Sequence, residues 1–167
     1  CGDGALWTQN LKKLPANIHI TLSDISEGML RDARRAIGSK DPRFTFRAFD
    51  CHSFPPKLGQ FDLVIANHVL FYCDNIGKVC KNIQKVLKPQ GRFLCSTYGS
   101  RPMREVSLLV QSFDERITLS GEKLYEHFGR ENGRAILSPY FQQITWQSYE
   151  DELVVTDAEP LISYILS

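Results

Sequence analysis

The stretch IHITLSDISEGMLRDARRAI, residues 18–37, decides the fold. Its first part alternates apolar and polar residues up to Asp24, which is typical of a β-strand. Ser26 then offers an N-cap, and the apolar residues after it recur at helical spacing: Met29, Leu30, Ala33 and Ile37. A strand that leads directly into an amphipathic helix is the first half of a β-α-β unit.

The same alternation continues along the chain. Strands are predicted over 43–49, 61–67 and 92–98, and a helix over 76–87, which the turn sequence KPQG ends. The 61–67 segment, FDLVIAN, is almost continuously apolar and predicts a strand that is buried on both faces. The pattern therefore predicts an α/β fold, a doubly wound Rossmann-like sheet with helices on both faces.

Residues 99–140 interrupt this rhythm with helical pieces predicted over 106–113, 122–128 and 130–137. A strand is predicted over 142–149, because Ile144 and Trp146 alternate with polar residues. A short extended piece over 152–156 and a helix over 158–166 follow. We therefore expect a single domain over 1–167, with a core over 1–98, a helical cap or lid over 99–140, and C-terminal strands and a helix over 141–167.

Composition bounds the function. The chain has 167 residues and a formal net charge of +1, and its hydrophobic share of 43% is that of a globular protein. A dedicated nucleic-acid binder carries a clear basic excess, so nucleic acid is an unexpected partner. No apolar run approaches the roughly 18–20 residues of a membrane span, and a membrane partner is not expected.

The five cysteines are Cys1, Cys51, Cys73, Cys80 and Cys95. Their odd number and the lack of a CxxC pair argue against a disulfide framework and a zinc site. Cys51 and His52 are adjacent, a spacing that favours neither a shared metal nor a catalytic dyad. We expect small buried hydrophobes at Cys73, Cys80 and Cys95, neither disulfides nor a metal, and a reducing, cytoplasmic location.

Polar residues mark the carboxyl ends of successive predicted strands, where open α/β sheets bind ligands. Cys1-Gly-Asp-Gly4 would lie between a strand and a helix, so its backbone could approach a ligand closely. Asp24 follows Gly4 by 20 residues, the spacing at which an acid accepts both hydroxyls of a ribose. Asp50 and Asn67-His68 end the next two strands. Together these residues predict a nucleotide-like ligand.

The glycine pattern restricts the class of ligand. A dinucleotide fingerprint that starts at Gly2 needs a third glycine at position 7, where this chain has Trp7. A bulky indole there would block the approach of a pyrophosphate. No Gly-Lys-Ser/Thr follows either, so a phosphate-binding P-loop is excluded. We expect a nucleotide-like ligand without a pyrophosphate.

These motifs resemble those of class I S-adenosylmethionine-dependent methyltransferases. CGDG looks like the end of their glycine-rich loop, DISEGMLRDA is similar to their D-x-S-x-x-M-L-x-x-A segment, and FDLVIANHVL is similar to their fourth-strand motif. LKPQGRF matches their L-x-P-G-G turn into the fifth strand, with Gln90 in place of the first glycine. The resemblance covers residues 1–98 in the correct order and implies that the helical cap is inserted after the fifth strand.

The resemblance also implies a role for each cofactor-binding residue. Cys1, Gly2 and Gly4 would shape the pocket for the methionine part of S-adenosylmethionine, and Asp24 would hold the ribose. The remaining roles are adenine and ribose packing by Ile25 and Met29, adenine recognition by Asp50 and Cys51, and contact with the sulfonium and methyl group by Asn67 and His68.

Each assignment has a plainer alternative. Asp24 could cap the following helix, Asp50 and Asn67 could be turn formers, and His68 could be a packed or solvated histidine. The sequence offers His68, Tyr72 and Tyr98 as candidate catalytic groups and selects none of them. Direct displacement at a sulfonium needs a base only if the acceptor must lose a proton.

The leading expectation is methyl transfer to a small-molecule acceptor, and a homodimer is left open. No N-P-P-Y or D-P-P-Y follows the 61–67 strand, which disfavours methylation of nucleic-acid bases. The alternatives are a non-catalytic S-adenosylmethionine-binding module and, less favoured, an NAD(P)-dependent oxidoreductase. Because the resemblance implies a central strand before Cys1, we expect the natural protein to extend upstream of Cys1 and beyond Ser167.

Overall fold

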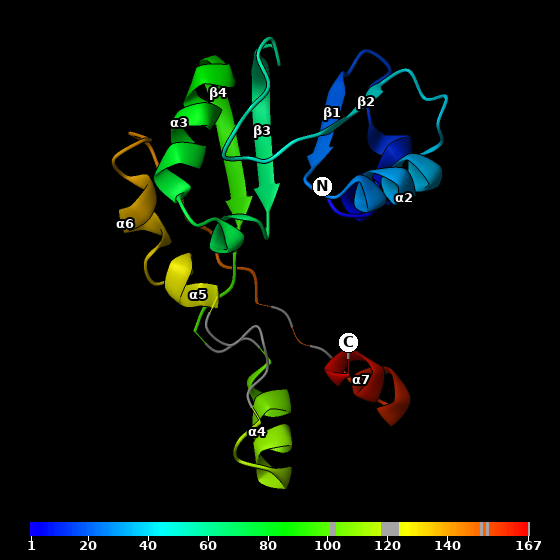
Figure 1. Cartoon of the computed structure of the whole chain (residues 1–167), viewed down its shortest axis with the longest axis vertical. Helices are drawn as coiled ribbons and strands as arrows, with labels where there is room; N and C mark the ends of the chain where they lie inside the picture. Colours follow the sequence, from blue (N-terminus) through cyan, green and yellow to red (C-terminus); the bar gives the residue numbers. More distant parts are fainter. Residues whose placement is uncertain (101–102, 118–123, 151, 153, 167) are drawn as a thin grey trace. The chain divides into compact units, whose positions relative to one another are not determined.

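The computed structural model describes residues 1–100, 103–117, 124–150, 152 and 154–166, and it divides into two compact units, Cys1–Ser96 and Thr97–Ser167. The first unit contains four strands and their connecting helices (Figure 1). Its elements are α1 (Ala5–Thr8), the 3-10 turn η1 (Leu11–Lys13), β1 (Ile20–Asp24), α2 (Glu27–Ile37), β2 (Phe44–Ala48), β3 (Phe61–Asn67), the 3-10 turn η2 (Leu70–Tyr72), α3 (Ile76–Val86) and β4 (Leu87–Ser96). The second unit holds α4 (Arg104–Phe113), α5 (Leu124–His127), α6 (Gly133–Leu137) and α7 (Ala158–Ile165).

The described strands form two parallel pairs. β1 pairs with β2 in the register Ile20↔Phe44 to Asp24↔Ala48, and β3 pairs with β4 up to Asn67↔Ser96. Each pair joins strands that a helix connects, which is the β-α-β unit that the sequence predicts. The parallel direction brings Asp24 and the loop after β2 to the same edge of the first pair.

The β1–α2 junction follows from local chemistry. The Ser26 side chain accepts a hydrogen bond from the backbone N–H of Met29 and so caps α2, as the sequence predicts. Gly38 ends the helix at φ 102°, a left-handed conformation that glycine adopts without strain. The buried face of α2 carries Leu30, Ala33 and Ile37.

Trp7 belongs to the core beside the first strand pair. Ile20, Leu22, Ile37 and Phe44 are buried together, and Trp7 packs against this cluster with its ring 6.2 Å from that of Phe44. Full burial of a large apolar side chain contributes about 1.5–3 kcal/mol, and the partly buried Trp7 gains a fraction of that. The indole thus occupies the position at which a dinucleotide fold has its third glycine.

The prediction that residues 61–67 are buried on both faces is wrong for the described structure. β3 has the predicted bounds, but none of its residues is buried and Leu63 is 42% exposed. β3 pairs with β4 along one edge, and among the described residues no second strand lies along its other edge. Apolar residues in a strand with a single neighbour keep contact with solvent.

The predicted turn between the 76–87 helix and the 92–98 strand is also different. α3 ends at Val86, and β4 starts directly at Leu87 with a register shift opposite Phe61 and Leu63. Gln90 has φ 64°, the left-handed region that favours glycine. The predicted turn residues 88–91 are part of an irregular strand, so β4 is longer than predicted.

In the second unit, the helices agree with the sequence patterns and the strands do not. Each predicted helix overlaps one of α4, α5, α6 and α7, but Phe128, residues 130–132 and Leu166 lie outside these helices, and residues 122–123 lie outside the described part of the chain. Residues 142–149 form no strand, although Ile144 and Trp146 are more buried than their neighbours. The Trp146 ring packs at Gly133, where an added Cβ would lie 3.1 Å from it, so contact with α6 accounts for the lower exposure of Trp146. The described residues of 152–156 form no strand either; residues 151 and 153 are outside the description.

No helix among the described residues is long and apolar enough to cross a membrane.

The conformation at Gln90 gives a test of the β3–β4 connection. Gln90→Gly should raise the free energy of unfolding by about 1 kcal/mol, because a non-glycine residue in the left-handed region costs about 1–2 kcal/mol and glycine returns part of that as unfolded-state entropy. Urea denaturation measures the change.

Gly91→Ala is the matched control and should destabilise the protein, because an added Cβ would lie 2.9 Å from the Lys88 carbonyl oxygen and 3.1 Å from that of Phe61. A stabilising Gly91→Ala or a destabilising Gln90→Gly would contradict this geometry.

Candidate functional site

The carboxylate of Asp24 organises the loop at the end of β1. Its Oδ2 accepts hydrogen bonds from the Cys1 amino group at 2.8 Å and from the Gly2 backbone N–H at 2.9 Å. Its Oδ1 accepts from the Ser26 backbone N–H at 2.9 Å. One side chain therefore joins the glycine loop, the strand end and the start of α2, which agrees with the alternative of a helix-entry group, and the ribose role of Asp24 stays a prediction.

Gly4 is fixed by close packing. It has φ 81°, and an added Cβ would lie 3.1 Å from the Ala33 Cβ and 3.3 Å from its Cα. Gly2 has φ 58° but has open space around its Cα. The loop thus needs glycine at position 4 for both conformation and contact with α2, and at position 2 for conformation.

The charge of Asp24 is stabilised in place. Partial burial raises its pKa, but the hydrogen bonds from the backbone nitrogens of Cys1, Ser26 and Gly2 outweigh burial and hold that pKa below its usual value. The carboxylate is therefore ionised at neutral pH and can accept hydrogen bonds. Three of its roughly four lone-pair sites are used by the hydrogen bonds above.

Two apolar side chains lie exposed just after Asp24. Ile25 is 74% exposed and Met29, one turn into α2, is 45% exposed. An anionic acceptor flanked by exposed apolar groups suits a ligand that has both hydroxyl groups and a flat ring. This is the pairing that the resemblance implies for ribose and adenine.

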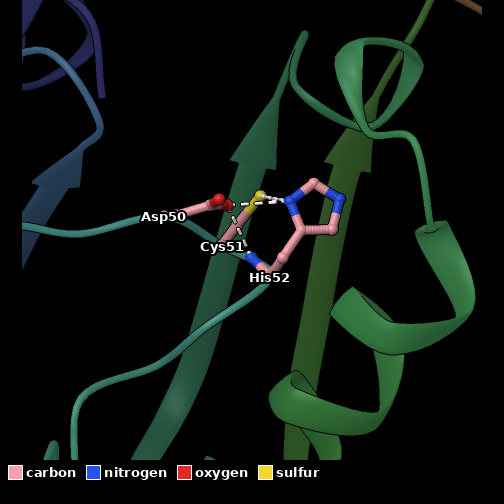
Figure 2. Close-up of side chains that lie close together, drawn as sticks. All are labelled: Asp50, Cys51 and His52. Atoms are coloured by element: carbon pink, nitrogen blue, oxygen red, sulfur yellow. Dashed lines mark hydrogen bonds and ion pairs between the residues drawn. The ribbon is translucent and has the colours of Figure 1, made fainter.

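The loop after β2 forms a compact polar cluster, Asp50-Cys51-His52 (Figure 2). Asp50 Oδ1 accepts from the His52 backbone N–H at 2.8 Å and lies 2.7 Å from His52 Nδ1. The Cys51 Sγ lies 3.9 Å from the same ring nitrogen. The Phe49 N–H donates to the Asp24 carbonyl oxygen at 3.1 Å, which ties the start of this loop to the end of β1.

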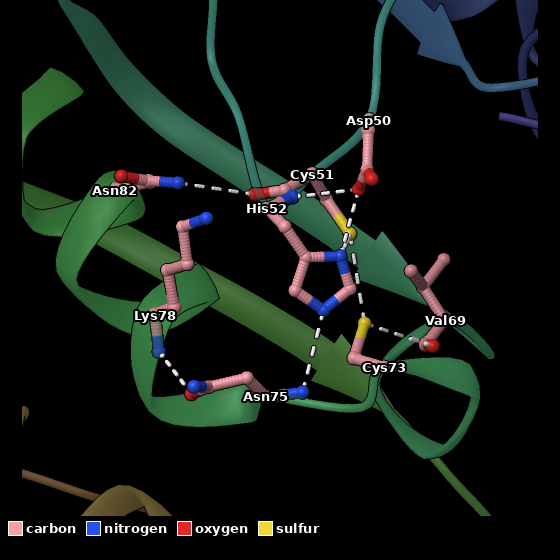
Figure 3. A network of polar contacts seen from close by, with 8 residues as sticks. All are labelled: Asp50, Cys51, His52, Val69, Cys73, Asn75, Lys78 and Asn82. Carbon is pink, nitrogen blue, oxygen red and sulfur yellow. Dashed lines mark hydrogen bonds and ion pairs between the residues drawn. The ribbon is translucent and has the colours of Figure 1, made fainter.

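This cluster is also linked to η2 and α3 (Figure 3). The Asn82 side chain donates to the Cys51 carbonyl oxygen at 3.2 Å, and the Asn75 N–H donates to His52 Nε2 at 3.4 Å. The second contact assigns the acceptor role to Nε2, so in the neutral ring the proton lies on Nδ1 and points to Asp50.

Cys73 joins the same network from the end of η2. Its Sγ lies 3.5 Å from the Cys51 Sγ and 3.6 Å from the Val69 carbonyl oxygen (Figure 3). A hydrogen bond from Cys73 lowers the pKa of Cys51 to about 7, against the opposing effect of burial. The pKa of Cys73 is raised, because this thiol keeps its proton beside Cys51 and is buried. Hydrogen bonds from the His52 backbone and ring hold the pKa of Asp50 below its usual value.

Asn67 and His68 lie together at the carboxyl end of β3, as predicted. Asn67 is exposed, and the His68 N–H donates to Ser96 at the end of β4. His68 has φ 50°, and its ring packs edge-on against Phe71 at 6.0 Å. One side of the His68 ring is therefore packed, as in the alternative of a packed histidine.

The two tyrosine candidates differ in position. Tyr72 is 68% exposed at the end of η2, and its ring contacts Phe71. Tyr98 belongs to the second unit, where its carbonyl oxygen accepts from the Arg130 N–H. The catalytic role of the two tyrosines stays a prediction.

The sequence argument missed His52 and Cys73. Adjacent side chains were expected to be unable to share a site, but Asp50, Cys51 and His52 have ligand-type atoms within 4.8 Å of one another. Asp50 accepting from the N–H two residues on is an Asx-turn, and Asp-x-His in a Pro-rich loop was a usable signal. Cys73 and Cys80 are buried as predicted and Cys95 is partly buried, but burial alone does not show that Cys73 meets Cys51.

The chain is similar in sequence to known methyltransferases. Residues 1–91 match a family model described as a methyltransferase domain. A malonyl-[acyl-carrier protein] O-methyltransferase from Ilyobacter polytropus is 29% identical over 120 residues, which are 72% of this chain and 45% of that protein. One from Priestia megaterium is 30% identical over 106 residues, covering 64% of this chain and 37% of that protein. The chain spans less than half the length of these relatives.

Solved structures show the same fold. An S-adenosylmethionine-dependent methyltransferase from Clostridium acetobutylicum has a TM-score of 0.53 at 22% identity, covering 64% of this chain and 44% of its own. A plantazolicin methyltransferase in complex with SAH has a TM-score of 0.56 at 15% identity, covering 83% and 52%. These likenesses confirm the predicted Rossmann-like α/β class.

The Cys51–Cys73 contact is testable by titration. In Cys73→Ala, the pKa of Cys51 should rise from about 7 toward the ordinary thiol value, because the largest stabilising contact of its thiolate is lost. Cys73→Ser retains a donor and should keep part of the shift. The pH dependence of Cys51 alkylation, read by mass spectrometry, measures the pKa.

Cys80→Ala is the control, since Cys80 is a buried thiol of α3 with its own pKa raised to about 11 by burial. An unchanged pKa of Cys51 in Cys73→Ala, or an equal change in Cys80→Ala, would show that Cys73 is not the cause.

Proposed function

The chain belongs to the methyltransferase domain family, and we propose that it transfers a methyl group from S-adenosylmethionine to a small-molecule acceptor. The observation that carries the proposal is the ionised Asp24 at the end of β1, bound to the glycine loop on one side and to the start of α2 on the other. This places a hydrogen-bond acceptor and a close-approach backbone at one strand end.

The residues at this edge fit the cofactor chemically. Asp24 retains acceptor capacity for a ribose hydroxyl, and the exposed side chains of Ile25 and Met29 offer apolar surface for an adenine ring. The Asp50–Cys51 loop is anchored to the end of β1 by the Phe49 N–H and could meet the adenine edge. Gly2, with open space around it, leaves room for the methionine part.

S-adenosylmethionine supplies a methyl group that its sulfonium makes electrophilic. The task of the protein is then to hold the acceptor in line with the methyl group and to exclude water. Asn67 and His68, at the carboxyl end of β3, are the residues that we propose beside the reacting atoms. A carboxylate acceptor arrives ionised, so no residue has to remove a proton from it.

We propose a carboxylate on an acyl thioester as the first acceptor to test. The support is the set of relatives named as malonyl-[acyl-carrier protein] O-methyltransferases, at 27–30% identity. The formal charge of +1 gives no basic excess for a nucleic-acid substrate. A cytoplasmic location and a homodimer stay predictions.

A dinucleotide-dependent oxidoreductase is disfavoured by the packing of Trp7. The indole contributes to the core around Phe44, so the third glycine position cannot open toward a pyrophosphate. The non-catalytic binding module differs from the enzyme only in turnover, and the two experiments below separate them.

S-adenosylhomocysteine should bind the protein in a calorimetric titration. Asp24→Asn should weaken that binding by roughly 10- to 100-fold, because a hydrogen bond to a charged group contributes about 1.5–3 kcal/mol. Asp62→Asn removes the same charge from an exposed ion pair with Lys88 at the amino end of β3 and should leave binding unchanged. Equal weakening by both variants, or no binding by the wild type, would refute the assignment.

Methyl transfer should be measurable with labelled S-adenosylmethionine and a malonyl thioester of an acyl-carrier protein. The expected product is a methyl ester, identified by mass spectrometry of the acyl group. Binding of S-adenosylhomocysteine together with no labelled product from this or any small carboxylic acid would identify a binding module instead of an enzyme.

A further inference from the structure

We propose that Cys51 and Cys73 are an oxidation site, in which a peroxide converts the pair into an intramolecular disulfide. The two Sγ atoms lie 3.5 Å apart although the residues are 22 positions apart in the sequence. A disulfide needs about 2.05 Å between sulfurs, so the thiols have to approach by roughly 1.5 Å. Cys51 lies in a loop, and loops can make such a movement more easily than packed helices.

The surroundings assign different roles to the two thiols. Cys51 is partly exposed, and its pKa of about 7 gives a substantial thiolate fraction at neutral pH, so it is the attacking sulfur. Cys73 is buried and keeps its proton, so it is the resolving thiol. Figure 3 shows the two sulfurs facing each other between the Asp50 loop and η2.

The other thiols lack this combination. Burial raises the pKa of Cys80 and of Cys95 to about 11. Cys80 lies in a helix, α3, and Cys95 lies in a strand, β4, whereas Cys51 lies in a loop. Cys1 is exposed but its sulfur contacts the Gly2 carbonyl oxygen. Cys51 is thus distinguished by both a low pKa and a thiol neighbour.

The chemistry balances in two steps. The Cys51 thiolate attacks one peroxide oxygen, an S–O bond forms as the O–O bond breaks, and the leaving hydroxide takes up a proton to become water. The sulfenic acid is then attacked by Cys73 sulfur, the S–S bond forms as the S–O bond breaks, and the leaving hydroxide takes the Cys73 proton. Two thiols and one hydrogen peroxide therefore give one disulfide and two waters, and a small dithiol reverses the change by exchange.

A disulfide between Cys51 and Cys73 would affect the loop that we propose at the cofactor. Asp50 and Cys51 form the loop that we propose at the adenine, so a disulfide would draw this loop toward η2 and away from the end of β1. Cofactor binding should then be weaker in the oxidised protein. This consequence rests on the proposed function, whereas the disulfide itself does not.

Peptide mapping of the full chain tests the disulfide. Trypsin separates the two cysteines, because Cys51 lies in the 48–57 peptide and Cys73 in the 58–78 peptide. After treatment with hydrogen peroxide and alkylation of the remaining thiols, we expect these two peptides to be linked. Cys73→Ser should instead leave a sulfenic acid at Cys51 that dimedone traps, and Cys51→Ser should leave Cys73 reduced.

The reactivity of the thiols can also be compared in the wild-type protein, so this test does not depend on whether a cysteine variant folds. At neutral pH, iodoacetamide should alkylate Cys51 roughly 100-fold faster than Cys95, since about four pKa units separate the thiols and nucleophilicity offsets nearly half of that difference. Similar rates for Cys51 and Cys95 would overturn the proposal. So would free Cys51 and Cys73 thiols at a peroxide concentration that already oxidises Cys95, or a linkage of Cys51 to any other cysteine.

Calorimetry with S-adenosylhomocysteine on reduced and oxidised protein tests the consequence separately. Weaker binding after oxidation that a dithiol restores supports the link to the cofactor. If the reduced protein does not bind, the proposed function fails while the peptide map still decides the disulfide. If both forms bind equally, the link to the cofactor is refuted.

Discussion

The carboxylate of Asp24 holds together the edge of the first unit at which function is proposed. It is ionised because backbone N–H groups from the loop before it and the turn after it point at its oxygens. The loop conformation in turn depends on Gly4, which lies so close to Ala33 that no side chain fits between them. The β1–β2 register then brings the Asp50 loop to the same edge. The glycine loop, the entry to α2 and the candidate site thus all depend on one partly buried anion and its donors.

The sequence predicted these parts well where the signal is local. The strand–helix junction at Ser26, the bounds of β3 and the start of α3 follow from alternation, capping and helical spacing within short windows. The resemblance to class I methyltransferases, argued from a series of short motifs in the correct order, is confirmed by the family match over residues 1–91. Local chemistry and motif order were sufficient for both.

Prediction was poorer where a segment depends on distant partners. Residues 142–149 alternate like a strand, but Trp146 is partly buried and packs at Gly133 of α6 instead of against a neighbouring strand. The apolar run of β3 indicates burial on both faces, which a strand with one described neighbour does not have. The contact of Cys51 with Cys73 needs the fold itself, since no rule of spacing relates residues in different loops.

The position of Trp7 has a consequence for how this site could change. In a fold of this type the choice of cofactor is usually thought to lie in the pocket, where residues can be exchanged at small cost. Here the third glycine of a dinucleotide fingerprint would have to replace a partly buried indole packed beside Phe44, and truncation of a fully buried residue of that size costs about 3–5 kcal/mol, which is the upper bound for Trp7. That is a large part of the stability of a small domain. The packing of Trp7 therefore acts as an evolutionary barrier, which keeps the chain with its present class of ligand whatever happens in the pocket.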